Sequence, residues 1–219
     1  MKFILFILLS VGAVSVNASG TAFGLRDPLT PASAQGNENL VGKEFPEICY
    51  ANKSSFDSIA HTIGERYGGG IIFYVYDHGR HGLIASTADQ IAGVPWYNGL
   101  TRFTGTDGDG LGKGAENTRI ILSKLIPDDE KGFFAAKVCA DYSVKTGGVV
   151  YADWYLPSKF ELNLLYQQKN RVGGFVNGNY WSSTEYKTNS VWIQYFGNGQ
   201  QRISNSEAYA NNVRAIRAF

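Results

Sequence analysis

Aromatic side chains beside polar ones are the residues of this chain best suited to recognition chemistry. Trp96 and Tyr97 stand before an asparagine in a glycine-rich stretch, and Tyr186, Lys187 and Asn189 fall in a short link between two β-type runs. Sugars stack the C–H faces of their rings on aromatic side chains, while amides and charges bind the hydroxyl groups. The pattern therefore predicts a ligand-binding surface that contains these five side chains.

Tryptophan is also common in protein cores, so the four tryptophans of the chain allow a second interpretation. Trp154, Trp181 and Trp192 lie within or next to β-type runs, where burial is the favoured interpretation. Trp96 lies in a predicted loop, and for this residue a core position and a surface position both stay open.

Basic residues near the C-terminus give the predicted surface a preference for anions. Residues 151–219 contain seven lysines and arginines and four acidic residues, a net charge of +3. The planar guanidinium group suits sulfate and carboxylate groups. Lys187 and Arg202 are predicted to form an anion-binding patch if the fold brings them together, and scattered solvated charge is the alternative. Arg214 and Arg217 face opposite sides of a predicted strand, so at least one is expected in a structural ion pair.

Of the acidic and histidine patterns in the sequence, the acidic turn at Asp107 and Asp109 resembles a metal site most. Alternating carboxylates followed by a glycine resemble the front of a calcium loop, but Glu116 falls short of the spacing that the distal glutamate requires. His78 and His81 form a pair without a third ligand near them in sequence, whereas zinc needs three or four ligands. We therefore expect a solvated acidic turn, with no metal and no organic cofactor, and calcium at Asp107 and Asp109 is the weaker alternative.

No arrangement of nucleophile and base stands out along the chain. Ser182, Ser183 and Glu185 supply hydroxyl groups and a carboxylate, but no histidine is near them in sequence. Cys49 and Cys139 are not the closely spaced pair used in redox chemistry. In an exported protein they are a candidate disulfide, and the alternative is that Cys139 is a free thiol buried on a helix. The chain is therefore predicted not to be an enzyme.

The N-terminus predicts export. Lys2 precedes a short apolar run, and small residues before the bond after Ala18 suit signal peptidase, so residues 1–18 are predicted to be a signal peptide. A retained N-terminal anchor is the alternative, and no later stretch is long and apolar enough to cross a membrane. Residues 19–39, rich in Gly, Ser, Ala, Pro and Asn, are predicted to be a flexible lead-in to a single domain at 40–219.

The middle of the chain combines a predicted β-hairpin with predicted helices. Residues 70–76 and 83–86 are β-type runs joined by a turn, and residues 94–114 are mostly loop. Two helices follow, the second starting just after Pro127, where three acidic residues favour a helix N-terminus. The apolar face of the first helix consists of Thr118, Ile121, Leu122 and Leu125. The apolar face of the second consists of Ala135, Val138, Cys139 and Tyr142.

The last third of the chain returns to β structure after one more helix. Ser158 and Glu161 have the spacing of a capping box, which predicts a helix start at Ser158. A turn is expected at Gly197-Asn198-Gly199 between two of the strands. The strands are predicted at 180–183, 191–196, 200–204 and 213–219. Because large aromatic residues continue to the last position, the final strand is predicted to lie in the core, and the order of elements predicts an α+β fold.

Separate motifs from residue 67 to the C-terminus carry a family resemblance. They lie at residues 67–73, 112–118, 135–142, 153–158, 180–185, 191–196 and 213–219. In this order they resemble the Lcl C-terminal domain family, named for the C-terminal domain of a collagen-like bacterial adhesin. The resemblance implies a C-type-lectin-like fold, similar to that of formylglycine-generating enzymes, with a small twisted antiparallel sheet, flanking helices and long loops. It also implies a role in binding sulfated glycans.

Two departures limit what the resemblance implies. The chain has no Gly-X-Y repeat, so the trimeric stalk of the adhesin is not implied and the oligomeric state stays open. The Glu-Pro-Asn and Trp-Asn-Asp motifs of calcium-dependent animal lectins are also absent. A sugar site bridged by calcium is therefore not implied either.

These observations predict an exported bacterial binding module, similar to an adhesin, that recognises sulfated or other acidic glycans. The alternatives are a secreted or envelope domain with a protein partner and an enzyme on the formylglycine-enzyme-like scaffold. The formal net charge of +1 gives no argument for nucleic acid as a partner. The predicted location is the periplasm, the cell surface or the exterior of the cell.

Overall fold

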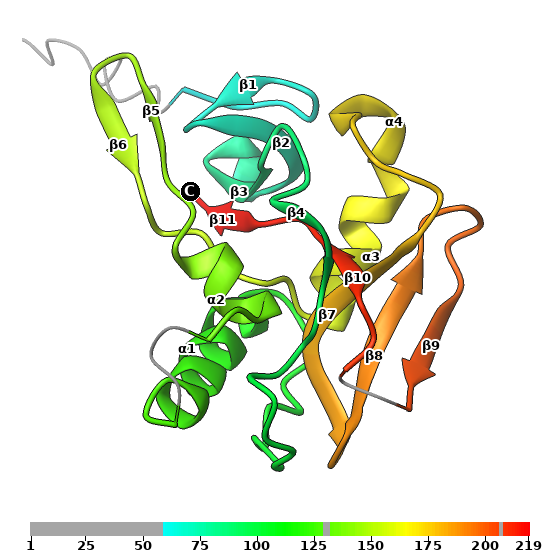
Figure 1. Ribbon diagram of the computed structural model, residues 1–219. Helices are drawn as coiled ribbons and strands as arrows, with labels where there is room; N and C mark the ends of the chain where they lie inside the picture. Colours follow the sequence, from blue (N-terminus) through cyan, green and yellow to red (C-terminus); the bar gives the residue numbers. More distant parts are fainter. Residues whose placement is uncertain (1–58, 129–131, 206–207) are drawn as a thin grey trace, which may run out of the picture. The chain divides into compact units, whose positions relative to one another are not determined.

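A computed structural model describes residues 59–128, 132–205 and 208–219 of the protein (Figure 1). The predicted signal peptide, the predicted lead-in at 19–39 and Cys49 lie outside the described residues. The described chain is a mixed α+β protein with several antiparallel sheets and few helices, which confirms the α+β part of the predicted fold. None of its helices combines the length and the apolar content that a bilayer span requires.

The first sheet has four antiparallel strands in the order β1-β2-β3-β11. Their bounds are Arg66–Tyr67 for β1, Gly70–Tyr76 for β2, His81–Ala85 for β3 and Ile216–Ala218 for β11. The predicted hairpin of β2 and β3 is confirmed, and a short 3-10 helix at Asp77–Gly79 makes the turn. Ile72 and Phe73 point to opposite faces of β2 and both are buried, as expected for an interior strand.

The second sheet has five strands in the order β4-β10-β7-β8-β9, and only the β10–β7 pair is parallel. Their bounds are Ile91–Val94 for β4, Asn179–Lys187 for β7, Ser190–Tyr195 for β8, Gln201–Ser204 for β9 and Asn211–Val213 for β10. The three predicted strands between residues 180 and 204 are confirmed, and β7 runs further than predicted. The turn after β8 is also confirmed, with a positive φ of 83° at Gly199.

The single strand predicted at 213–219 is wrong in one respect, because it is divided between the two sheets. β10 ends at Val213, and the chain crosses through Arg214 and Ala215 before β11 begins at Ile216. Both crossing residues are buried, and the Arg214 Nε atom bonds the Asp89 carboxylate at 2.7 Å. The C-terminal segment is therefore interior as predicted, and it joins the two sheets.

Four α-helices occur in the described part of the chain, at Lys113–Leu125 for α1, Ala135–Ala140 for α2, Lys159–Gln167 for α3 and Lys169–Val172 for α4. The predicted apolar face of α1 is confirmed, since Thr118, Ile121 and Leu125 are buried. The helix start predicted after Pro127 is wrong. The second helix begins only at Ala135, whose N–H donates to the Pro95 carbonyl at 3.0 Å.

The capping box of α3 is confirmed and has a larger role than the sequence predicted. The Ser158 hydroxyl accepts from the Glu161 N–H, and the Glu161 carboxylate accepts from the Ser158 N–H. Glu161 is also fully buried and accepts from the N–H groups of Gly112 and Gly114. One carboxylate therefore fixes both the start of α3 and the loop that precedes α1.

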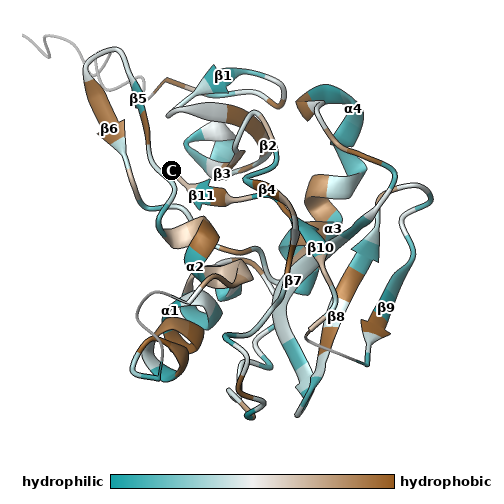
Figure 2. Ribbon diagram, viewed as in Figure 1, coloured by the Kyte–Doolittle hydropathy of each residue, from teal (hydrophilic) through white to brown (hydrophobic). Residues whose placement is uncertain are grey.

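A hairpin that was not predicted from the sequence follows α2 in the chain and forms a separate two-stranded sheet. Its strands are β5, Val144–Thr146, and β6, Val149–Tyr151. The turn between them is Gly147-Gly148, with φ values of 57° and 82° that glycine adopts without strain. Figure 2 shows hydrophobic residues on β6, and these include Val149 and Val150, both exposed.

Candidate functional site

The structure corrects the prediction that Trp96 and Tyr97 belong to a ligand-binding surface. Trp96 is 1% exposed, and its Nε1 atom donates to the Ser182 carbonyl at 2.9 Å. Tyr97 packs half-buried against the same core. The segment after β4 folds against β7, so Trp96 joins the buried Trp154 and Trp181 in the core and is not available to a surface ligand.

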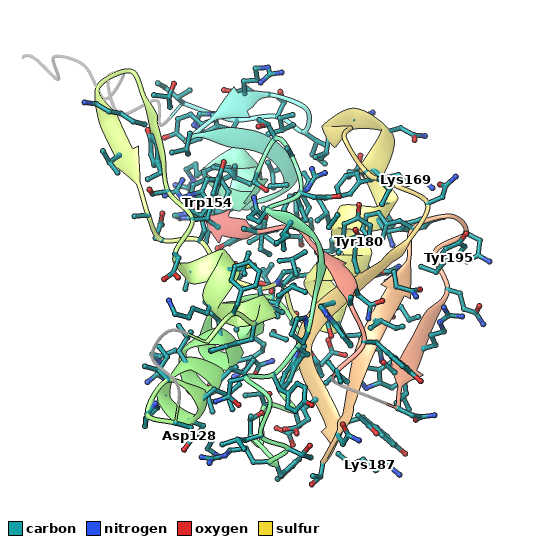
Figure 3. The ribbon with its side chains drawn as sticks, viewed as in Figure 1. Asp128, Trp154, Lys169, Tyr180, Lys187 and Tyr195 are labelled. Atoms are coloured by element: carbon teal, nitrogen blue, oxygen red, sulfur yellow. The ribbon has the colours of Figure 1, made fainter. Side chains whose placement is uncertain are left out.

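Tyr186, Lys187 and Asn189 lie at one end of the β7–β8 hairpin. Tyr186 and Lys187 belong to β7 and not to a loop, and Asn189 occupies the tight turn with a φ of 59°. Figure 3 shows Lys187 at the opposite end of β7 from Tyr180. Tyr186 is exposed, and its ring meets that of Trp192 edge to face at 6.1 Å. Trp192 is only partly buried, unlike Trp154 and Trp181, so its expected core position is not fully met.

Lys187 and Arg202 do not form the predicted anion-binding patch. Lys187 pairs with Ser190, whereas Arg202 pairs with Ile193, so the two are about 10 Å apart along β8. The Arg202 Nη2 atom also donates to the Asn179 side chain at 2.9 Å, toward the far end of β7. The charges are therefore scattered, which was the alternative interpretation.

Asp109 holds the start of α3 in place. Its Oδ1 atom accepts from the Phe160 N–H at 2.7 Å, and its Oδ2 atom lies 3.8 Å from the Lys159 ammonium group. Asp107 is an exposed residue of the same loop. Within residues 59–128, 132–205 and 208–219, no three His, Cys, Asp or Glu side chains are placed to hold a metal ion.

Cys139 is a free thiol in the core of the described chain, while Cys49 lies outside the described residues. Complete burial raises the pKa of the Cys139 thiol well above its ordinary value. The thiolate is the nucleophilic form of cysteine, so burial disfavours the reactive form of this thiol in the folded protein.

An open groove between two glycine hairpins is the most recognisable candidate site. One wall is the turn of the β1–β2 hairpin, and the other is the β5–β6 hairpin; we call the space between them the hairpin groove. Its volume is about 500 Å³. The lining residues are Arg66, Tyr67, Gly68, Gly69, Gly70, Thr87, Val144, Lys145, Thr146, Gly147, Val149 and Tyr151.

The charge of the hairpin groove is positive on both walls. Arg66 on β1 and Lys145 on β5 are exposed, and neither forms an ion pair or side-chain hydrogen bond with another described residue. The described lining contains no acidic side chain. Two cations that line a common space, without a neutralising partner among the described residues, make that space favourable for negative charge.

Aromatic rings supply the apolar part of the groove. Tyr67 is 41% exposed, and its ring packs against that of Phe219 at 5.4 Å. Tyr151 lies half-buried on the facing wall, with the Arg217 guanidinium 4.8 Å from its ring. Arg217 bonds the Gly68 carbonyl at 3.4 Å and pairs with Asp153 at 2.7 Å, so its charge is neutralised while it braces the two walls.

A close contact at Gly69 sets the distance between the walls. Gly69 has a φ of 86°, and a Cβ atom there would run into the side chains of Val144 and Tyr151. The base of the β5–β6 hairpin therefore packs directly on the β1–β2 turn. The two walls share one sequence feature, a Gly-Gly turn with a basic residue two positions before it, but Arg171 stands in the same way before Gly173-Gly174, so this feature alone does not identify the groove.

Comparison with known proteins gives no family for the chain. A scan against protein-family models found no match, and neither did a search of curated proteins. The function of the groove is therefore interpreted from its own geometry.

Proposed function

We propose that the protein is an exported bacterial binding module with a C-type-lectin-like fold that recognises acidic glycans through the hairpin groove. One observation carries the proposal, namely that Arg66 and Lys145 face the same open groove without neutralising partners among the described residues. The resemblance to the Lcl C-terminal domain family supports the same class of ligand.

The groove suits an acidic sugar better than a neutral sugar or a bare ion. Guanidinium and ammonium groups bind sulfate and carboxylate, and the rings of Tyr67 and Tyr151 offer surfaces for sugar C–H groups. Exposed ion pairs contribute only about 0.2–1 kcal/mol each. We therefore expect modest affinity that falls as the salt concentration rises.

Binding without chemistry is the activity that the lining favours. Its reactive groups are the hydroxyls of Thr87, Thr146 and two tyrosines, and the described lining contains no histidine, cysteine or carboxylate. His61 stacks on the Tyr67 ring at 3.9 Å outside this lining, and its Nδ1 atom is already bonded to Glu65 at 2.8 Å. A hydroxyl nucleophile needs a base to be activated. The proposal is therefore a lectin-like module and not an enzyme.

Glycan-array binding at low and high salt, followed by titration of the best acidic glycan, tests the proposal. The double variant Arg66→Glu/Lys145→Glu should lose binding at least tenfold, because attraction becomes repulsion on both walls. Lys187→Glu/Arg202→Glu is the matched control, since it reverses two exposed charges away from the groove.

Two results would contradict the proposal. One is binding that survives the groove variant and is lost in the control variant, which would return the site to the β7–β8–β9 surface. The other is the absence of any salt-dependent binding to sulfated or carboxylated glycans by the unaltered protein.

A further inference from the structure

The outer strand of the five-stranded sheet is a separate feature that the groove does not explain. β9 pairs with β8 on one side only, and Figure 1 shows it at the outer edge of its sheet. An unpaired strand edge presents a row of backbone donors and acceptors to other chains.

The register of β8 and β9 identifies which backbone groups face outward. The Tyr195 N–H donates to the Gln200 carbonyl at 2.9 Å, and the Tyr195 carbonyl accepts from the Gly199 N–H at 2.7 Å, so Tyr195 is at a hydrogen-bonded position of the ladder beside the turn. Hydrogen-bonded pairs alternate along an antiparallel ladder, which places Arg202 in the next one. Gln201 and Ile203 therefore turn their N–H and C=O groups away from β8. These four groups have no hydrogen-bond partner among the described residues.

Side chains next to this edge differ between the two faces of the sheet. Arg202 is exposed on one face, donates to Asn179 through one nitrogen and forms no ion pair with a described residue. Ile203 lies on the other face, directly opposite the partly exposed Trp192. The Lys159 ammonium group is 4.0 Å from the Trp192 ring, so this face is aromatic and bordered by positive charge.

We propose that β9 binds an extended segment of a protein partner as an added strand. The outward groups of Gln201 and Ile203 supply the backbone hydrogen bonds. A carboxylate opposite Arg202 pairs with the free guanidinium nitrogens, and an apolar side chain opposite Ile203 extends the Trp192 surface. The partner is thus an extended segment in which an acidic residue has apolar neighbours.

The same geometry disfavours a second copy of this chain as the occupant. Two β9 strands can pair antiparallel about a two-fold axis and use all four outward groups if Gln201 of each copy pairs with Ile203 of the other. The axis then passes between the two Arg202 residues. This pairing places the two Arg202 side chains directly opposite each other, where like charges repel. Arg202 therefore disfavours the pairing of two β9 strands, and a charged side chain is a common means by which edge strands avoid aggregation. The same positive charge favours an acidic partner.

Amide NMR on the purified full chain tests the proposal with two short peptides, Thr-Val-Glu-Val-Thr and Thr-Val-Lys-Val-Thr, both capped at their ends. The glutamate peptide should shift the amide signals of Gln201 and Ile203 and slow their hydrogen exchange. We expect it to bind about fivefold more tightly than the lysine peptide.

Two variants separate the parts of the proposal. Arg202→Glu should reverse the preference between the peptides by a similar factor. Ile203→Pro removes one outward N–H and no bond to β8, so it should abolish peptide binding while the cooperative melting of the protein is kept.

Three outcomes would overturn the proposal. They are peptide-induced shifts confined to residues away from β9, an unchanged preference in Arg202→Glu, and full binding by a folded Ile203→Pro variant. Because the readout lies on β9, these outcomes are independent of glycan binding in the hairpin groove.

Discussion

The loop at residues 102–112 and the β5–β6 hairpin show two different ways of holding a segment in place. The loop has no helix or strand, yet the N–H groups of Thr104 and Gly105 donate to one carboxylate oxygen of Glu185, at 2.8 and 2.9 Å. Glu185 itself is 2% exposed. The loop is therefore fastened to β7 by hydrogen bonds to a buried carboxylate, which are stronger than the same bonds in water.

The hairpin has regular secondary structure but little support from the rest of the protein. Its ladder has three residue pairs, and its residues from Lys145 to Val150 are exposed. Packing is confined to the base, where Val144 meets Gly69 and Tyr151 meets Arg217. An isolated two-stranded hairpin is only marginally stable in water.

This contrast indicates that buried polar contacts decide how firmly a segment is held, more than its secondary structure does. A wall of the hairpin groove that packs only at its base has few contacts to hold it, and segments with few buried contacts open locally more easily than the core. The loop at 102–112, in contrast, serves the start of α3 and the end of β7. Substitutions in and around the two segments test the contrast, beginning with the most destabilising.

Replacement of Glu161 should cost the most stability. Glu161→Ala leaves the N–H groups of Gly112, Gly114 and Ser158 without their acceptor, and those of Gly114 and Ser158 are buried, so we expect a loss of about 3–5 kcal/mol in unfolding free energy. Urea denaturation measures this loss, and Glu116→Ala, an exposed glutamate on α1, is the matched control with a change below about 0.5 kcal/mol. A loss below about 1 kcal/mol for Glu161→Ala is the size expected of a single surface contact. It would contradict the conclusion that buried polar contacts decide how firmly a segment is held.

The two hairpin turns of the groove should respond differently to the same substitution. Gly69→Ala and Gly148→Ala introduce a Cβ atom at similar φ values of 86° and 82°. At Gly69 the added methyl group meets Val144, whereas at Gly148 nothing lies within 4 Å. We expect a loss of about 3 kcal/mol for Gly69→Ala and about 1 kcal/mol for Gly148→Ala, measured by thermal or urea unfolding. Equal losses would show that the loss in unfolding free energy comes from backbone strain alone and that packing between the walls does not contribute.

The buried carboxylate of Glu161 should give the stability a dependence on pH. Burial raises the pKa of Glu161, against the opposing effect of the N–H groups that donate to it. The folded state then holds this proton at higher pH than the unfolded state, so the contribution of Glu161 is fully present below pH 4.5 and is lost as pH rises through the raised pKa. Denaturant unfolding from pH 4 to 8 measures the difference in unfolding free energy between the unaltered protein and Glu161→Gln. We expect this difference to shrink as the pH rises, and a difference that grows with pH would contradict a raised pKa of Glu161.

Polar substitution on the hairpin should change the stability least. Val150 is 60% exposed on β6, so Val150→Thr should change the unfolding free energy by less than about 0.5 kcal/mol. The matched variant Val191→Thr, at a buried position of β8, should lose about 1–3 kcal/mol because it buries a hydroxyl group. A comparable loss at both positions, measured by the same urea titration, would mean that the β6 surface is covered in the folded protein.

Strong local signals explain the parts of the fold that were predicted correctly. The apolar run at 70–76, the capping box at Ser158 and the glycine turn at 197–199 were confirmed, because each depends on residues a few positions apart. The β5–β6 hairpin was missed because its strands are short, and the start of α2 was misplaced. The position of that start depends on the Pro95 carbonyl, a group that is distant along the chain.

The candidate site could be predicted only in part. Lys187 and Arg202 were correctly expected at the surface, but their separation follows from the register of β7, β8 and β9. Arg66 and Lys145 did not stand out in the sequence, because nothing in it shows that two hairpins distant along the chain come into contact at Gly69.

Local patterns in the sequence were enough to define most of the strands and helices and the interior position of the C-terminal segment, since apolar spacing, caps and turns act over a few residues. Tertiary packing was needed to establish which polar and aromatic side chains stay accessible. Trp96 became a core residue when its loop folded onto β7, while Arg66 and Lys145 came to share one groove. Accessibility depends on contacts between segments far apart in sequence, and no local pattern records those contacts.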